Sequence, residues 1–296
     1  MTTAFVLSGG GSLGAVQVGM LQALAARGVT PDFLVGASAG ALNAAFLAGH
    51  GFTDDALTDL ERIWRGLRRQ DVFPFTPTRH LLALAGARPS LCAPDNLARL
   101  IDRELPYARL EDAVVPVHVL ATDVLSGMEV RLSSGDATSA VLASAAIPAV
   151  FPAVERDGRF LFDGGVANNT PLSHAVGLGA DRVVVLPTGY ACDLRAAPAT
   201  ALGSAVHALT LLVQQRLMLD VAAYHDRVDL MVLPPLCPLS VSSADFRHAG
   251  ELISRARGAT TRWLDNGSDR LPHPERFLAM HGHDRRATNE SGGAAA

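Results

Sequence analysis

Two glycine-rich segments, each directly after an apolar run, constrain the fold of this chain more than any other feature. The first covers residues 8–14 and follows the apolar residues 4–7; the second covers residues 36–40 and follows residues 33–35. Such short apolar runs predict buried strands, and a helical periodicity follows each glycine segment. The order strand, helix, strand, helix predicts an α/β fold with parallel strands and right-handed crossovers.

The rest of the chain continues this alternation. Apolar runs predict strands at residues 4–8, 33–37, 117–121, 129–132, 159–162, 182–186 and 228–233. Periodicity and capping signals predict helices at residues 14–27, 39–48, 54–67, 136–146, 200–224 and 245–264, with further helix starts at Asp95 and Thr170. Residues 71–94 contain four prolines and are expected to be irregular. We expect one globular domain over residues 1–270 and a polar, disordered tail over residues 271–296.

Charge and residue usage exclude several classes of function. The formal net charge of −4 argues against a nucleic-acid-binding protein and against electrostatic anchoring to anionic lipid. All 25 basic residues are arginine, so a lysine nucleophile, a Schiff base and a Walker-type phosphate site are excluded.

The three cysteines are Cys92, Cys192 and Cys237, far apart in the sequence. Their spacing fits neither a zinc site nor a disulfide framework, so we expect no metal and a cytoplasmic location. The first residues lack the basic segment of a signal peptide, and no apolar stretch is long enough to span a membrane.

Ser38 lies at the centre of the second glycine segment, between Gly36 and Gly40. A serine on a tight turn between a strand and a helix projects its hydroxyl from the sheet edge, and small neighbours relieve the crowding of that turn. The helix behind it adds a positive dipole end. Ser38 is therefore a candidate nucleophile, although five small residues can also form an ordinary tight turn.

Gly9, Gly10 and Gly11 form a loop without side chains, so their backbone N–H groups are open to a ligand. Two such groups can hold a developing oxyanion, and each donor is worth about 2.7–4 kcal/mol in the transition state. The crossover is expected to place this loop at the same sheet edge as Ser38.

With Gly14, the same loop also matches a dinucleotide-binding fingerprint. That fingerprint requires an acidic residue at the end of the second strand. The acidic residue here, Asp32, lies at the start of that strand, which disfavours the dinucleotide interpretation.

The residues do not fix the base that would activate Ser38. Four histidines follow on predicted helices and would complete a Ser–Asp–His order, namely His174, His207, His225 and His248. Asp163 ends a predicted strand and is followed by Gly164 and Gly165, so its carboxylate would lie on an open bend. By itself this triplet also fits an ordinary Asp-Gly turn.

In this order, the segments resemble those of the patatin-like phospholipases, a family of lipid acyl hydrolases. The resemblance covers residues 4–190 and rests on Gly9-Gly10-Gly11-x-x-Gly14, Gly36-x-Ser38-x-Gly40, Ala143-Ser144-x-x-x-Pro148, and Asp163-Gly164-Gly165 with Asn169-x-Pro171. One departure is Leu13, where many bacterial members carry arginine or lysine.

The resemblance implies a three-layer α/β/α sandwich around a mostly parallel sheet. It implies a Ser–Asp dyad, with Ser38 as nucleophile, Asp163 as base and residues 9–11 as the oxyanion hole, supported by Gly14 and the two glycines after the aspartate. The expected reaction is hydrolysis of fatty-acyl esters of phospholipids or related lipids through an acyl-enzyme, without metal or organic cofactor. An aspartate near its reference pKa is expected to retain activity well below pH 6, although burial would raise that limit.

Residues 71–94 are a candidate lid or rim of the acyl-chain groove, because they carry Val72, Phe73, Phe75, Leu81, Leu82 and Leu84. A lid would imply a peripheral, hydrophobic membrane contact. Alternatively, these side chains pack on the core. Two other functions stay open: an α/β-hydrolase esterase with a histidine triad, and a lipid-binding protein without catalysis.

Overall fold

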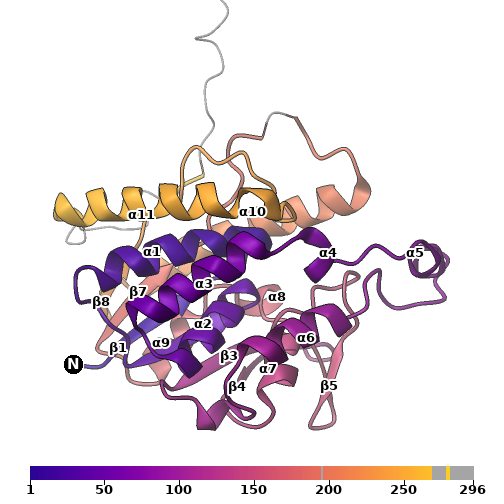
Figure 1. Cartoon of the computed structure of the whole chain (residues 1–296), viewed down its shortest axis with the longest axis horizontal. Helices are drawn as coiled ribbons and strands as arrows, with labels where there is room; N and C mark the ends of the chain where they lie inside the picture. The colour runs from indigo at the N-terminus through magenta and orange to yellow at the C-terminus, as the bar shows by residue number, and fades with distance from the viewer. Residues whose placement is uncertain (195, 269–277, 281–296) are drawn as a thin grey trace, which may run out of the picture.

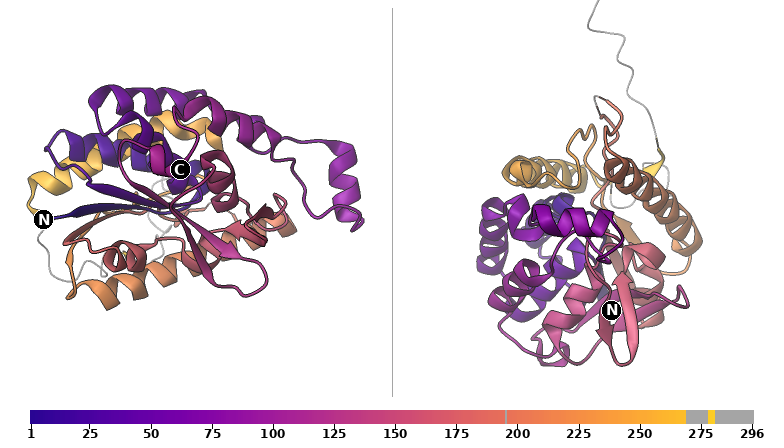
Figure 2. Two further views of the ribbon diagram at one scale, coloured as in Figure 1. Left: turned by 90° about the horizontal axis from the view of Figure 1, so that it is seen from below. Right: turned by 90° about the vertical axis from the view of Figure 1, so that its right-hand side faces the viewer.

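The computed structural model describes residues 1–194, 196–268 and 278–280, which form one sheet covered by helices on both faces (Figures 1 and 2). The strand order is β5-β6-β3-β2-β1-β7-β8, with β4 paired to β3. The parallel strands are β1 (Thr3–Leu7), β2 (Phe33–Ala37), β3 (Val117–Asp123), β7 (Arg182–Leu186) and β8 (Asp229–Val232). The antiparallel pairings come from β4 (Glu129–Leu132), β5 (Val154–Arg156) and β6 (Arg159–Asp163).

The helices form two outer layers. One face carries η1 (Gly11–Gly14), α1 (Ala15–Ala25), α2 (Ala39–His50), α3 (Asp54–Gly66), α6 (Asp95–Glu104), α7 (Ala137–Ser144), η3 (Phe246–His248) and α11 (Ala249–Asp265). The other face carries α9 (Leu172–Gly177) and α10 (Ala201–Tyr224), while α8 (Gly165–Asn168) follows β6. The short η2 (Leu110–Asp112) precedes β3, and α4 (Arg69–Val72) and α5 (Pro77–Leu84) extend away from the body (Figure 1).

The central strand β1 shows why both faces need helices. Phe5 and Leu7 belong to the core under α1 and α2, whereas Ala4 and Val6 belong to the core under α9 and α10. A strand that is apolar on both sides requires cover on both faces of the sheet. The predicted three-layer α/β/α sandwich is thus confirmed, with a mixed sheet whose five central strands are parallel.

Most predicted elements form within a few residues of the expected positions, and the differences have local causes. Residues 71–94 are not irregular throughout, because Pro77 at the first turn of α5 starts a helix. Strand β5, a short edge strand of three residues, was not predicted. Of the predicted tail, residues 271–277 and 281–296 lie outside the described residues. Leu278 is buried, and its carbonyl accepts a hydrogen bond from Gln214 Nε2. The prediction that the chain is disordered from residue 271 onward is therefore wrong at this residue.

Within the described residues, none of the helices combines the length and the hydropathy that crossing a bilayer requires.

Candidate active site

Ser38 occupies the sharp turn between β2 and α2, with φ 52° and ψ −123°. A positive φ is costly for a residue with a side chain, so the surroundings must hold this turn. A Cβ atom on Gly40 would collide with the carbonyl of Leu7, and one on Gly36 would lie 2.5 Å from the Gly40 carbonyl oxygen. The Ser38 N–H donates to Ser144 Oγ at 2.9 Å, which fixes the turn from the side of α7.

The hydroxyl of Ser38 points at a buried carboxylate. Ser38 Oγ donates to Asp163 Oδ2 at 2.7 Å, and Asp163, at the end of β6, is only 5% exposed. The other carboxylate oxygen, Oδ1, accepts the N–H of Gly165 at 2.7 Å. Thr122 Oγ1 donates to the Asp163 carbonyl at 2.9 Å. The carboxylate is therefore held by the backbone through one oxygen and offers the other to the serine.

Burial raises the pKa of Asp163 to about 6, against the lowering effect of the hydrogen bonds from Ser38 and Gly165. The raised pKa makes the carboxylate a stronger base than an exposed aspartate, while it stays ionised at neutral pH.

The glycine loop after β1 divides into a fixed residue and two open ones. The N–H of Gly9 donates to the Asn169 carbonyl at 3.1 Å, and the Gly9 carbonyl accepts from Thr188 Oγ1 at 2.7 Å. Gly9 is therefore part of the scaffold, which corrects the expectation that its N–H faces an oxyanion. Among the residues that the structure describes, the N–H groups of Gly10 and Gly11 have no acceptor.

A buried polar network supports this loop from below. Gln17 Nε2 donates to the Ser8 carbonyl at 2.8 Å, and Asn43 Nδ2 donates to the Gly14 carbonyl at 3.0 Å and to Gln17 Oε1 at 2.8 Å. Trp64 Nε1 donates to Asn43 Oδ1 at 2.8 Å. The sequence analysis missed these residues. For Gln17 and Asn43, the sequence feature that could have identified them is a single amide side chain on the otherwise apolar buried face of α1 and of α2.

Leu13 is fully buried in the core beside α1, so this position contributes no charge beside the glycine loop.

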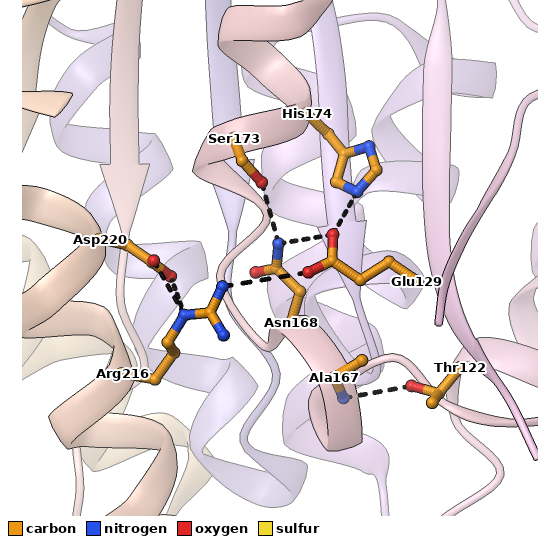
Figure 3. A network of polar contacts seen from close by, with 8 residues as sticks. All are labelled: Thr122, Glu129, Ala167, Asn168, Ser173, His174, Arg216 and Asp220. Carbon is orange, nitrogen blue, oxygen red and sulfur yellow. Dashed lines mark hydrogen bonds and ion pairs between the residues drawn. The ribbon is translucent and has the colours of Figure 1, made fainter. Parts of the chain in front are cut away.

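The candidate histidines bond to other groups or line the surrounding cavity. His174 Nε2 pairs with Glu129 Oε2 at 2.6 Å on the far side of α8, as Figure 3 shows. His207 lines the wide cleft described below. In the described part of the chain, no histidine is hydrogen-bonded to Ser38 or Asp163.

The polar network in Figure 3 anchors the segment that follows Asp163. Glu129 of β4 accepts from His174 of α9 and, at 3.1 Å, from Asn168 Nδ2 of α8. Arg216 of α10 lies 4.0 Å from Glu129 and pairs with Asp220. These contacts connect α8 to β4, α9 and α10, and they hold the end of β6 against the helical layer.

Two cavities meet at Ser38. The first, here called the apolar pocket, has a volume of about 80 Å³ and lies between α2, α3, α6 and α7. Its lining includes Gly11, Ser38, Ala45, Phe46 and Glu104. The second, here called the wide cleft, has a volume of about 770 Å³ and is lined by residues 9–11, Ser38 and Asp163 together with polar and apolar residues of the surrounding loops.

Several known proteins are similar to this chain. A family model described as patatin-like phospholipase matches residues 5–176. An uncharacterised NTE family protein of Mycobacterium tuberculosis is 30% identical over 183 residues, which cover 62% of this chain and 48% of that protein. Patatin-like phospholipase domain-containing protein 7 of Rattus norvegicus is 30% identical over 189 residues, 63% of this chain and 13% of that protein.

Lysophospholipase nte1 of Aspergillus terreus is 28% identical over 188 residues, 64% of this chain and 12% of that protein. The solved structure of VipD from Legionella pneumophila gives a TM-score of 0.45 at 17% identity, over 90% of this chain and 67% of that one. The alignments span about half or less of the length of these curated relatives. The family model matches more than half of the length of this chain. The chain therefore belongs to the patatin-like phospholipase family.

Proposed function

We propose that this chain is a serine hydrolase that cleaves fatty-acyl ester bonds of phospholipids or related lipids, with Ser38 as nucleophile and Asp163 as base. The observation that carries the proposal is the 2.7 Å hydrogen bond between Ser38 Oγ and Asp163 Oδ2, at the point where the apolar pocket opens into the wide cleft. The names of two relatives, a lysophospholipase and a phospholipase domain protein, support a lipid ester as the substrate class.

In the first half of the reaction, Ser38 Oγ attacks the ester carbonyl carbon while its proton moves to Asp163 Oδ2. The charge that develops on the carbonyl oxygen is stabilised by the open N–H groups of Gly10 and Gly11, together with the N–H of Ala39 at the start of α2. When the tetrahedral intermediate collapses, the C–O bond to the alcohol breaks, and the proton on Asp163 passes to the leaving oxygen.

In the second half, a water molecule takes the place of the alcohol. Asp163 accepts one of its protons while the water oxygen attacks the acyl-enzyme carbonyl, and Ser38 Oγ regains the proton as it leaves. The fatty acid is released. Gly165 keeps Asp163 Oδ1 occupied throughout, so the proton is carried on Oδ2 in both halves.

The two cavities suit the two ends of such a substrate. The apolar pocket is lined almost wholly by carbon and can take an acyl chain, whose burial contributes about 0.8 kcal/mol per methylene. The wide cleft has room and polar groups for the alcohol portion. With the acyl chain in the pocket and the alcohol portion in the cleft, the ester carbonyl would lie beside Ser38.

A fluorophosphonate probe tests the nucleophile directly. We expect the intact chain to gain one probe mass, Ser38→Ala to gain none, and Asp163→Asn to react at least about a thousandfold more slowly. His207→Ala is the matched control, because His207 lines the cleft without a bond to the pair, and it should react like the parent chain. An unlabelled parent chain would favour a lipid-binding protein without catalysis, and loss of reaction in His207→Ala would favour a histidine triad.

A further inference from the structure

Residues 68–90, here called the arm, extend from the body of the molecule and contain α4 and α5 (Figures 1 and 2). The base of the arm is fixed, because the ring of Phe73 packs on that of Phe151 at 5.7 Å and on that of Phe246 at 5.9 Å. Farther out, every residue of α5 is at least partly exposed to solvent. The arm is thus an anchored projection.

The outer part of the arm exposes large apolar side chains. Phe75 is 74% exposed, Leu81 70%, Leu82 43% and Leu84 81%. For these four side chains, this finding overturns the alternative that they pack on the core; Val72 of the same segment lies in the core, and Phe73 packs against it. Clustered exposed apolar side chains of this kind mark a surface that contacts another apolar phase.

The arm is also basic, in contrast to the rest of the chain. It carries Arg68, Arg69, Arg79 and Arg88 against Asp71, a net charge of +3 in a chain whose net charge is −4. Arg79 donates to Ser90 Oγ at 2.9 Å and secures α5, while the residues Arg68, Arg69 and Arg88 are exposed. The overall negative charge, which argued against an anionic lipid surface, therefore conceals a positive segment.

The arm borders the candidate active site. Phe75 and His80 line the wide cleft, whose lining also includes Ser38 and Asp163. An apolar surface on the arm that enters a lipid layer would bring the open side of this cleft against the lipid headgroups.

We propose that the arm is a docking surface for an anionic lipid bilayer. Leu81, Leu82 and Leu84 enter the boundary between headgroups and acyl chains, and the exposed arginines lie against the negative headgroups. Apolar insertion combined with basic residues is the usual way in which an interfacial helix binds a membrane. Each arginine near an anionic surface strengthens binding about fivefold. The role of docking in substrate delivery rests on the proposed function, but vesicle binding does not.

Vesicle flotation of the full chain in a Ser38→Ala background tests this proposal without hydrolysis of the lipid. We expect binding to vesicles of phosphatidylcholine mixed with phosphatidylglycerol, and much weaker binding to phosphatidylcholine. The double variant Arg69→Gln/Arg88→Gln should bind the anionic vesicles about thirtyfold more weakly. The double variant Leu81→Asp/Leu84→Asp should lose binding to both kinds of vesicle. Added salt should weaken the parent chain and leave the arginine variant nearly unchanged.

Matched variants separate the arm from general effects of charge and hydrophobicity. Arg131→Gln/Arg227→Gln removes two exposed arginines elsewhere, and Leu212→Asp/Leu219→Asp changes two exposed leucines of α10; both should bind as the parent does.

Equal binding to both kinds of vesicle, or unchanged binding of the arm variants, would overturn the proposal. So would a leucine variant that still binds vesicles but no longer self-associates, since the arm would then be a protein interface. Cleavage of a water-soluble short-chain ester, measured with Ser38 intact, reports separately on the proposed catalysis.

Discussion

Asp163 combines two opposing influences in one side chain. Burial raises its pKa to about 6, while the bonds from Ser38 and Gly165 keep the ionised form accessible. If Asp163 is the base, activity should fall as pH decreases through about 6, because protonation removes the acceptor for the serine proton. This limit is higher than an ordinary aspartate would give. It lies close to the histidine reference value of about 6.5, so the rate profile cannot by itself distinguish the two bases.

The same pKa predicts how Asp163→Asn changes stability. Because the native state binds the proton more tightly than the unfolded state, ionisation costs native stability as pH rises from about 4 through about 6. An asparagine amide can accept from Gly165 and donate to Ser38 without a buried charge. We expect Asp163→Asn to raise the free energy of unfolding by up to about 3 kcal/mol above pH 7 and by little near pH 4, measured by urea unfolding. Destabilisation above pH 7 would contradict the raised pKa.

Trp64 gives a second prediction for a single group. Its indole N–H is the partner of Asn43 Oδ1, in a network that also holds the Gly14 carbonyl. Trp64→Phe keeps an aromatic ring but leaves the amide oxygen buried and unpaired, so it should cost about 1–3 kcal/mol in the free energy of unfolding. A variant as stable as the parent chain would show that the network does not support the glycine loop.

In the proposed function, helix α2 serves both the chemistry and the choice of acyl chain. Its N-terminus follows Ser38, and the residues from Ala39 to Phe46 line the apolar pocket over about two turns. At 1.5 Å per residue, the lined stretch is about 12 Å long. Glu104, which pairs with Arg103, also lines the pocket and is an unfavourable neighbour for an acyl chain.

We therefore expect Ala45→Leu, which enlarges a side chain that lines the pocket, to shift the preference toward shorter acyl chains. One or two lost methylene positions are worth about 10- to 200-fold in kcat/KM. The measurement is kcat/KM for a series of p-nitrophenyl esters of increasing chain length, with Ala48→Leu as control. Ala48 is equally buried on α2 but does not line the pocket, so its enlargement should leave the length preference unchanged. Equal shifts in both variants would show that the pocket does not hold the acyl chain.

At the scale of the whole molecule, features that depend on local sterics were predictable from the sequence. Features that depend on contacts between segments far apart in the chain were not. The turn around Ser38 was predictable because only small residues fit it. The proximity of Asp163 depends on β6 pairing with β3, where Asp163 stands opposite Ala121. The N–H of Gly9 is not open to an oxyanion because it donates to the carbonyl of Asn169, 160 residues away. The positive charge of the arm was not apparent from the net charge of the whole chain, which is negative.

The part of the chain beyond residue 176, which the family model does not match, completes the fold. Strand β7 lies beside β1, and α11 packs on α1 so closely that a Cβ on Gly19 would collide with the Ile253 carbonyl. Two effects of Gly19→Ala therefore oppose each other. Helix propensity favours alanine by about 0.8–1.0 kcal/mol, whereas overpacking costs about 1–3 kcal/mol or more.

We expect the collision to dominate, so Gly19→Ala should lower the free energy of unfolding of the whole domain in a single cooperative transition followed by circular dichroism. Gly66→Ala at the end of α3 is the matched control, because no atom lies within 4 Å of its added Cβ, and it should be neutral or slightly stabilising. A Gly19 variant that gains as much stability as the Gly66 variant would mean that α11 can move away from α1. The C-terminal helix would then be an accessory to the fold, and the contribution of this region to the sheet would come from β7 and β8.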